Sequence, residues 1–88
     1  MSSILDEIMD AYSEEEFLIA DGFDDAIIGI DTQSLRIVYS VTKCIEILKE
    51  RDGMDEEEAI EFFEFNTLRG NDYMGEGRPI FMEDYFGI

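Results

Sequence analysis

The sequence contains no histidine and no tryptophan, and it has one cysteine and one proline among 88 residues. The missing histidine removes the commonest general base and metal ligand of proteins. A single cysteine excludes an internal disulfide bond and fits a reducing compartment. We therefore expect a protein that is not an enzyme and that has no catalytic residues, no cofactor and no metal ion.

Positive charge is also scarce. Six Lys and Arg stand against 23 Asp and Glu, which gives a formal net charge of -17 at pH 7. A surface this negative repels nucleic acid and anionic membranes, and it attracts basic protein surfaces over long range. Solubility is the competing explanation of scattered acids, but the charge exceeds the magnitude of about 2–8 that suits a small soluble domain.

Long hydrophobic runs are missing as well. No stretch approaches the roughly 18 apolar residues of a membrane span, and the N-terminus lacks the basic and apolar regions of a signal peptide. We therefore expect a cytoplasmic protein that does not enter a membrane. Hydrophobic residues still make up 45% of the chain, with seven Phe and four Tyr, so we predict one folded domain over residues 1–88.

Helical periodicity predicts that the chain begins with a helix over residues 3–12, with Ser2 or Ser3 as its N-cap. The apolar face of this helix consists of Ile4, Leu5, Ile8, Met9 and Tyr12. Residues 13–16 follow the S-x-x-E capping-box pattern. They predict either a second short helix over residues 17–20 or a continuation of the first helix.

The next segment predicts a β-hairpin. β-branched residues bounded by turn residues indicate strands over residues 25–31 and 35–39. On the first strand, one face is expected to carry Ala26, Ile28 and Ile30.

Two further helices are predicted after the hairpin. Ser40 is expected to cap a helix over residues 41–51, and Gly53 to end it. The core stripe of that helix is Val41, Cys44, Ile45 and Leu48. Asp55 and Glu58 have capping-box spacing at the start of the next helix. The apolar face expected there comprises Ala59, Ile60, Phe62 and Phe63, and this helix is expected to end at Gly70.

Residues 79–82 indicate a third strand, and Pro79 places it at a sheet edge. The expected fold is a small α+β domain with a helical N-terminus, a β-hairpin, two helices and a third short strand. The sheet is expected to be antiparallel or mixed.

No motif in the sequence carries catalysis or metal binding with any specificity. Cys44 lies in an apolar helical stripe, which indicates a buried small hydrophobic residue. Acidic neighbours occur by chance when acids are this frequent. The acidic turns at residues 21–25 and 71–72 lack the EF-hand pattern for calcium. The glycines of residues 70–77 are interrupted by acids that would repel a phosphate group.

The acids are therefore interpreted as a binding surface. Carboxylates one and two helical turns apart lie about 5 and 11 Å apart along a helix axis, a spacing comparable to that of DNA phosphates. Such a protein can occupy the Lys- and Arg-lined groove of a DNA- or RNA-binding protein without binding nucleic acid itself. The predicted partner-binding residues are Asp6, Glu7, Asp10, Glu14, Glu15, Glu16, Glu56, Glu57, Glu61 and Glu64.

The alternative function is a structural or regulatory module that forms a homo-oligomer, such as a homodimer, through apolar surface. Phe62 and Phe63 are expected in the core. Core packing is also the default for the remaining aromatics, with interface exposure as the alternative for Phe65, Tyr73, Tyr85 and Phe86. The acids would then only keep the protein in solution.

Four segments, residues 36–40, 43–48, 53–66 and 75–81, resemble a family of small acidic proteins encoded by tailed bacteriophages. The runs KCIEIL and EEEAIEFFEFN are the most specific parts, and the resemblance covers residues 24–83. It implies a setting, the cytoplasm of an infected bacterium, and no mechanism. Small acidic phage proteins include inhibitors of bacterial defence nucleases that imitate DNA, so the expected function is an inhibitor of a basic host defence protein.

Overall fold

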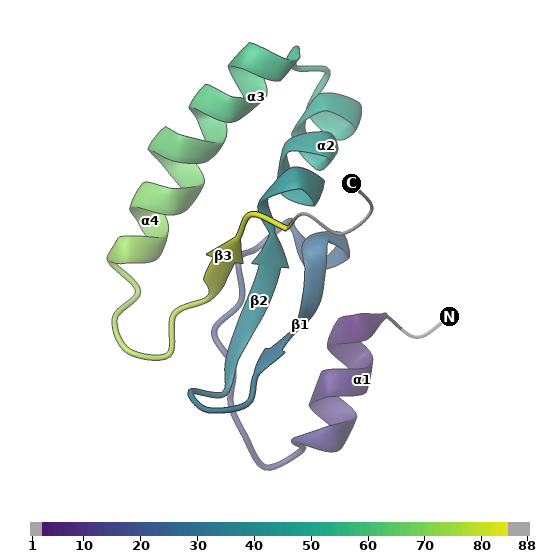
Figure 1. Ribbon diagram of the computed structural model, residues 1–88, viewed down its shortest axis with the longest axis vertical. Coiled ribbons are helices and arrows are strands. Elements are labelled where there is room, and N and C mark those ends of the chain that lie inside the picture. Colours follow the sequence, from purple (N-terminus) through teal and green to yellow (C-terminus); the bar gives the residue numbers. More distant parts are fainter. Residues whose placement is uncertain (1–2, 85–88) are drawn as a thin grey trace.

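A three-stranded mixed sheet forms the centre of the computed structural model, which describes residues 3–84 (Figure 1). Its strands are β1 (Ile27–Asp31), β2 (Arg36–Ser40) and β3 (Ile80–Met82), in the order β1-β2-β3. β1 pairs antiparallel with β2, whereas β3 pairs parallel with β2. The predicted hairpin, third strand and α+β class are confirmed, and β3 lies at a sheet edge as Pro79 indicated.

The hairpin differs from the expectation in the faces of its first strand. A β-bulge lies between Ile27 and Gly29, and a short 3-10 helix, η1 (Asp24–Ala26), precedes the strand. Ile27 is consequently buried in the core together with Ala26, while Ile28 is only half-buried. The predicted face of Ala26, Ile28 and Ile30 is therefore wrong, because the bulge interrupts the alternation that the pattern assumed.

The first helix, α1 (Ile4–Ala11), packs against β1. Ser3 caps it with a complete capping box, in which the Asp6 N–H donates to Ser3 Oγ and the Ser3 N–H donates to Asp6 Oδ2. Leu5 and Ile8 are its buried residues. Ser3 thus fills the predicted N-cap position, and Ser2 lies outside the described residues.

No helix follows at residues 17–20, so that prediction is wrong. The segment after α1 is a turn and an irregular stretch. The Phe17 ring packs edge-on against Tyr12, with centroids 6.4 Å apart. The Ala20 N–H donates to the Tyr39 hydroxyl at 2.7 Å. The contact with Tyr39, which is distant in the sequence, and the nearer contact with Tyr12 hold this irregular path, and they override the local capping-box signal.

α2 (Val41–Asp52) confirms the helix predicted after the hairpin. Ser40 caps it by accepting a hydrogen bond from the Lys43 N–H, and Gly53 ends it with a φ of 69°, a left-handed conformation that suits glycine. Cys44 and Leu48 are fully buried. Val41 and Ile45 are only partly buried, so the predicted core stripe is half correct.

The last helical segment is one continuous helix with three parts, α3 (Glu56–Phe62), the π-helical η2 (Phe63–Leu68) and α4 (Arg69–Asp72). It runs along one side of the sheet while α1 lies on the other side (Figure 1). The i→i+5 bonding of a π-helix suits this sequence, because Phe63 and Leu68 are five residues apart and both pack on the core. The helix continues past Gly70, where the sequence had predicted its end.

Two residues of the predicted apolar face of α3 are exposed. Ala59 and Phe63 are buried, whereas Ile60 is 41% exposed and Phe62 is 39% exposed. The prediction that Phe62 lies in the core is wrong, because α3 is covered on only part of its apolar circumference. Phe63 packs edge-on against Phe81, which stacks on Tyr39 with centroids 5.2 Å apart.

Candidate protein-docking surfaces

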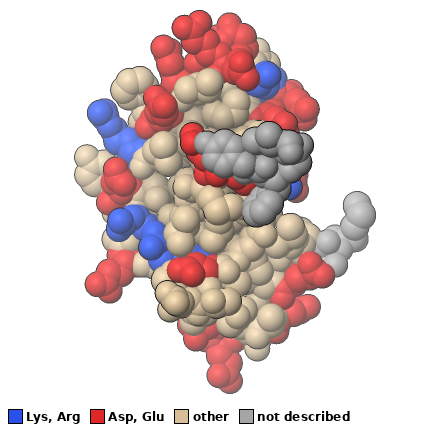
Figure 2. All heavy atoms as spheres, viewed as in Figure 1, with Lys and Arg blue, Asp and Glu red and all other residues tan. Residues whose placement is uncertain are grey.

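The predicted partner-binding acids form two separate groups and not one face. Asp6, Glu7 and Asp10 are exposed on α1, and Figure 2 shows carboxylates gathered at both ends of the long axis of the molecule, which measures 39 Å. We call the first group the α1 acidic end; it consists of Asp6, Glu7, Asp10, Glu14, Glu15 and Glu16. The second group is the α3 acidic end, which consists of Glu56, Glu57, Glu61 and Glu64.

Within the α1 acidic end, Glu14, Glu15 and Glu16 do not lie on a helix. They follow α1 in the turn and irregular stretch, where all three are exposed. The expectation that these acids recur at helical spacing is therefore wrong for this segment. Only Asp6, Glu7 and Asp10 have the helical spacing on which the comparison with DNA phosphates was based.

The α3 acidic end retains helical spacing. Asp55 caps α3 with a complete capping box, in which the Glu58 N–H donates to Asp55 Oδ1 at 2.8 Å. These two carboxylates therefore serve the helix end. Glu57 and Glu61 are four residues apart and exposed, so they lie on one face of α3.

A groove of about 570 Å³ lies between α2 and the α3–η2 helix, and we call it the α2–α3 groove. Its apolar lining comprises Val41, Ile45, Ile60, Phe63, Leu68 and Phe81. The volume falls within the range of about 300–1,000 Å³ that is typical of ligand sites. The partial exposure of Ile60 and the partial burial of Val41 and Ile45 follow from this open groove.

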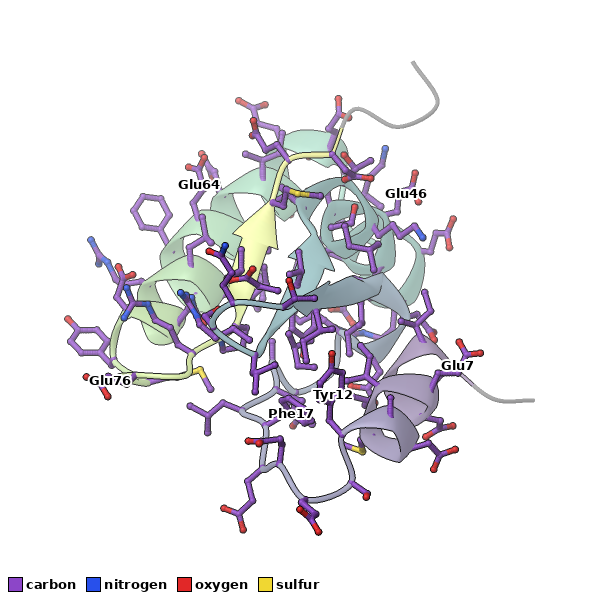
Figure 3. The ribbon with its side chains drawn as sticks, turned by 60° about the horizontal axis from the view of Figure 1, so that its bottom comes forward. Glu7, Tyr12, Phe17, Glu46, Glu64 and Glu76 are labelled. Carbon is purple, nitrogen blue, oxygen red and sulfur yellow. The ribbon has the colours of Figure 1, made fainter. Side chains whose placement is uncertain are left out.

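The rim of the α2–α3 groove is acidic. Its charged residues are Glu46, Lys49, Glu56, Glu64, Glu83 and Asp84. Glu46 extends from α2 and Glu64 from the α3–η2 helix, whereas Glu7 extends from α1 (Figure 3). Ser40 Oγ donates to Asp84 Oδ1 at 2.5 Å, which fixes the end of β3 beside the start of α2. Two of the predicted binding acids, Glu56 and Glu64, thus border apolar surface.

The sequence analysis missed this groove. The spacing of Val41 and Ile45 fits a buried stripe, and no feature of the sequence distinguishes Glu46 from the other acids. The available signal was the width of the apolar faces of the two helices. Each face is wider than the partner helix covers, but only the packing of the helices shows which edge stays open.

Cys44 and Tyr39 are buried and protonated. Cys44 is fully buried, and burial raises the pKa of its thiol to about 12. Burial also raises the pKa of Tyr39 to about 12, and its hydroxyl is occupied by the Ala20 N–H. Within residues 3–84 no three His, Cys, Asp or Glu side chains are grouped so that they could hold a metal ion.

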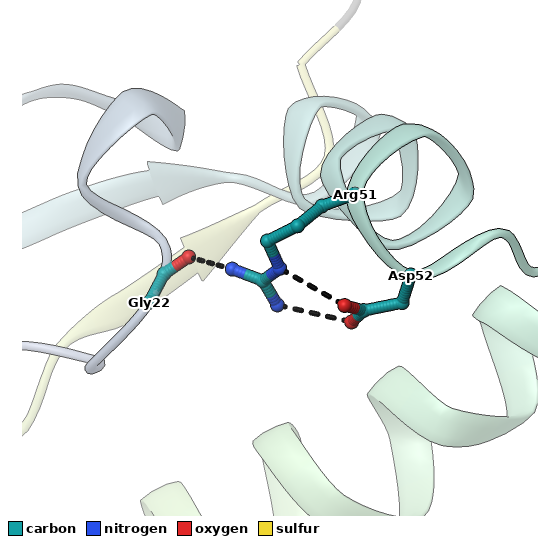
Figure 4. Close-up of polar contacts among 3 residues, drawn as sticks. All are labelled: Gly22, Arg51 and Asp52. Atoms are coloured by element: carbon teal, nitrogen blue, oxygen red, sulfur yellow. Dashed lines mark hydrogen bonds and ion pairs between the residues drawn. The ribbon is translucent and has the colours of Figure 1, made fainter.

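Arg51, near the end of α2, links this helix to the turn that precedes η1. Arg51 Nη1 donates to the Gly22 carbonyl at 2.6 Å, and Nη2 forms an ion pair with Asp52 at 3.1 Å (Figure 4). The hydrogen bonds from Arg51 lower the pKa of the Asp52 carboxyl. The Arg51 guanidinium also lies 5.6 Å from the centre of the Phe23 ring. The Arg51 guanidinium therefore stabilises the fold.

Several aromatic and aliphatic side chains outside the groove are exposed. Phe65 is 60% exposed and Tyr73 is 85% exposed. Core packing, the default expectation for these two residues, is wrong because the chain turns away after α4 and covers neither. Tyr85 and Phe86 lie outside the described residues.

The comparisons with known proteins assign no family. No protein family matches the chain, and neither a curated protein nor a solved structure matches it. None of the helices in the described part of the chain is long and apolar enough to cross a membrane.

Proposed function

We propose that this protein is a non-enzymatic inhibitor that docks its carboxylates on a basic, nucleic-acid-binding protein and blocks it. The observation that carries the proposal is the exposure of the acids. All 23 acidic side chains lie within the described residues, and all of them except Asp31 and Asp84 are classed as exposed. Six Lys and Arg cannot neutralise them, so the field that attracts a basic partner remains.

The structure narrows the proposal to two candidate contact regions. The α1 and α3 acidic ends lie at opposite ends of the molecule (Figure 2), so one basic groove of a partner meets one end at a time. The α3 acidic end is the stronger candidate, because Glu57 and Glu61 keep helical spacing and Glu56 and Glu64 border apolar surface. Ion pairs formed beside apolar surface are screened less by solvent than ion pairs in open water.

The setting is also part of the proposal. The resemblance to small acidic proteins of tailed bacteriophages suggests the cytoplasm of an infected bacterium, where the target is a DNA- or RNA-binding defence protein of the host. This part is independent of the exposed acids and would survive on its own if the docking surface were found elsewhere.

The test is capture of the partner from bacterial lysate at low salt, followed by elution with duplex DNA and, separately, with high salt. A DNA mimic releases a nucleic-acid-binding protein under both conditions. A variant with Glu56, Glu57, Glu61 and Glu64 changed to Lys should lose the partner while its circular dichroism spectrum is unchanged. Retention of the partner by this variant and by the corresponding α1 variant would refute the proposal.

A second candidate function, a homo-oligomeric interaction module, is favoured by the exposure of Phe65 and Tyr73. Aromatic side chains are enriched at interface centres. Sedimentation at high salt, where the charge repulsion between copies is screened, separates the two functions. An oligomer that persists at high salt and dissociates on Phe65→Ser and Tyr73→Ser would favour this module.

A further inference from the structure

We infer that the α2–α3 groove is the docking site for a basic amphipathic segment of the partner protein, an α-helix that inserts apolar side chains and places Lys or Arg along the rim. This inference rests on the proposed function and adds the chemical class of the segment that is bound. It depends on three properties of the groove: its apolar lining, the sign of its rim and its length.

The lining requires apolar anchors. Ile60 is 41% exposed in the groove, opposite the partly buried Ile45 of α2. A concave site with a mainly apolar lining offers room for hydrophobic side chains of a partner. Acids alone would serve a purely electrostatic partner, so the open apolar lining indicates that the bound segment brings hydrophobic side chains.

The rim selects a basic segment. Glu46 borders the groove from α2, and Glu56 and Glu64 border it from the facing helix, while Lys49 is the cation among its lining residues. A nucleic acid or an anionic lipid would be repelled there. A second copy of this chain would bring its own charge of -17 against the same carboxylates. Charge complementarity therefore favours a Lys- or Arg-bearing partner over self-association.

The dimensions suit a helix. α2 has 12 residues, and at about 1.5 Å per residue it is about 18 Å long. The groove lining runs from Val41 to Lys49 on α2 and from Glu56 to Leu68 on the facing helix, so the groove accommodates about two to three turns of a third helix. Amphipathic helices bind such grooves through apolar anchors at i, i+3 or i+4, and i+7.

The test uses a fluorescein-labelled helical peptide about 14 residues long, with leucines at that spacing and lysines elsewhere, and follows binding by fluorescence anisotropy. One control peptide has the same composition with the leucines distributed around the helix, and another is oligolysine of equal charge. We expect the amphipathic peptide to bind about tenfold more tightly than either control, since one buried apolar side chain has an effect of that size.

Matched variants locate the site. Ile60 and Ile4 are both 41% exposed on helices, so Ile60→Ser and Ile4→Ser disturb folding similarly. Ile60→Ser should weaken peptide binding about tenfold, and Ile4→Ser should leave it unchanged. In the same way Glu64→Lys should weaken binding at low salt, while Glu14→Lys at the other end should have a smaller effect.

Three results would overturn the inference. Equal binding of the three peptides would show that charge alone docks the partner; the proposed function would then stand and the groove would not be the site. Binding only to a variant that ends at Asp84 would show that the chain's own end occupies the groove. A dimer that dissociates on Ile60→Ser would assign the groove to self-association. The proposed function is tested separately, by whether the variant with Glu56, Glu57, Glu61 and Glu64 changed to Lys still captures the partner from lysate.

Discussion

The α1 and α3 acidic ends both carry exposed carboxylates but differ in what lies beside them. α1 buries Leu5 and Ile8 against β1, and none of its residues lines the α2–α3 groove. α3 buries Ala59 and leaves Ile60 partly open between two helices. Charge alone would favour the α1 acidic end, which has six exposed carboxylates against four at the α3 acidic end. The two ends therefore differ in the apolar surface beside their acids, and this difference is our reason for proposing the α3 acidic end as the specific site.

We expect the largest effect from removing the Phe63 side chain, which packs the α3–η2 helix against the sheet. Phe63 is 2% exposed and packs against Phe81, so Phe63→Ala should cost about 3–5 kcal/mol of the free energy of unfolding. Urea denaturation followed by circular dichroism measures this. Phe65→Ala, two residues along η2 at a 60% exposed site, is the control and should cost under about 1 kcal/mol. Equal costs would contradict the packing that holds the groove open.

Phe63 is buried and Phe65 is exposed, and this contrast shows which features the sequence could predict. End signals of helices were read correctly at Ser3, Ser40 and Asp55, because a cap depends on residues within one turn. The faces of α3 were read only in part. Whether Ile60 and Phe62 are covered depends on where α2 and β3 lie, and that information is not contained in the local pattern.

The same limit applies to the candidate site. Residues 13–16 carry a capping-box pattern, but Tyr39 draws the following segment into an extended path through its bond with the Ala20 N–H. The capping-box pattern predicted helical spacing for Glu14–Glu16, but these acids lie on a turn and an irregular stretch. The predicted acids of the α3 end keep their helical spacing because α3 begins at a true cap. The groove itself arises from tertiary packing and has no sequence motif.

An alkaline titration tests whether the two ends share one core. The pKa of Cys44 is raised from 9.0 to about 12 and that of Tyr39 from 10.0 to about 12, both chiefly by burial. Between these values the unfolded chain loses protons that the folded chain keeps, so stability falls as pH rises. We expect the two groups together to cost about 3 kcal/mol at about pH 10.5 relative to pH 8, about 2 of it from Cys44.

Tyr39 contacts both halves of the molecule, through the Ala20 N–H on one side and Phe81 on the other. The signals of α1 and α3 should therefore be lost at the same pH, as nuclear magnetic resonance can follow residue by residue. Cys44→Ala is the control, and it should shift the transition to higher pH. Loss of α1 at a lower pH than α3 would show that the α1 end folds as a separate unit.

Cap substitutions should produce a smaller and paired effect. Ser3 and Asp55 each form a complete capping box, so Ser3→Ala and Asp55→Ala should each cost about 1 kcal/mol. Hydrogen exchange distinguishes the two ends. The loss from Ser3→Ala should be confined to the amides of α1, because this helix contacts mainly β1. The loss from Asp55→Ala should extend through α3 into η2, which is continuous with it.

The smallest stability effect is expected where the functional effect is largest. Glu64→Gln and Glu14→Gln each remove one exposed carboxylate, and both should change the free energy of unfolding by less than about 0.5 kcal/mol. The sign should be stabilising in both cases, because each variant relieves repulsion in a chain of net charge -17. Urea denaturation at low salt measures the stability of the two variants side by side, and high salt should abolish the gain in stability.

Binding of the amphipathic peptide should nevertheless weaken for Glu64→Gln and not for Glu14→Gln, because only Glu64 borders apolar surface. A clearly destabilising effect of Glu64→Gln would contradict the predicted gain in stability. It would show that the Glu64 carboxylate stabilises η2, and a binding role would not be needed to explain it.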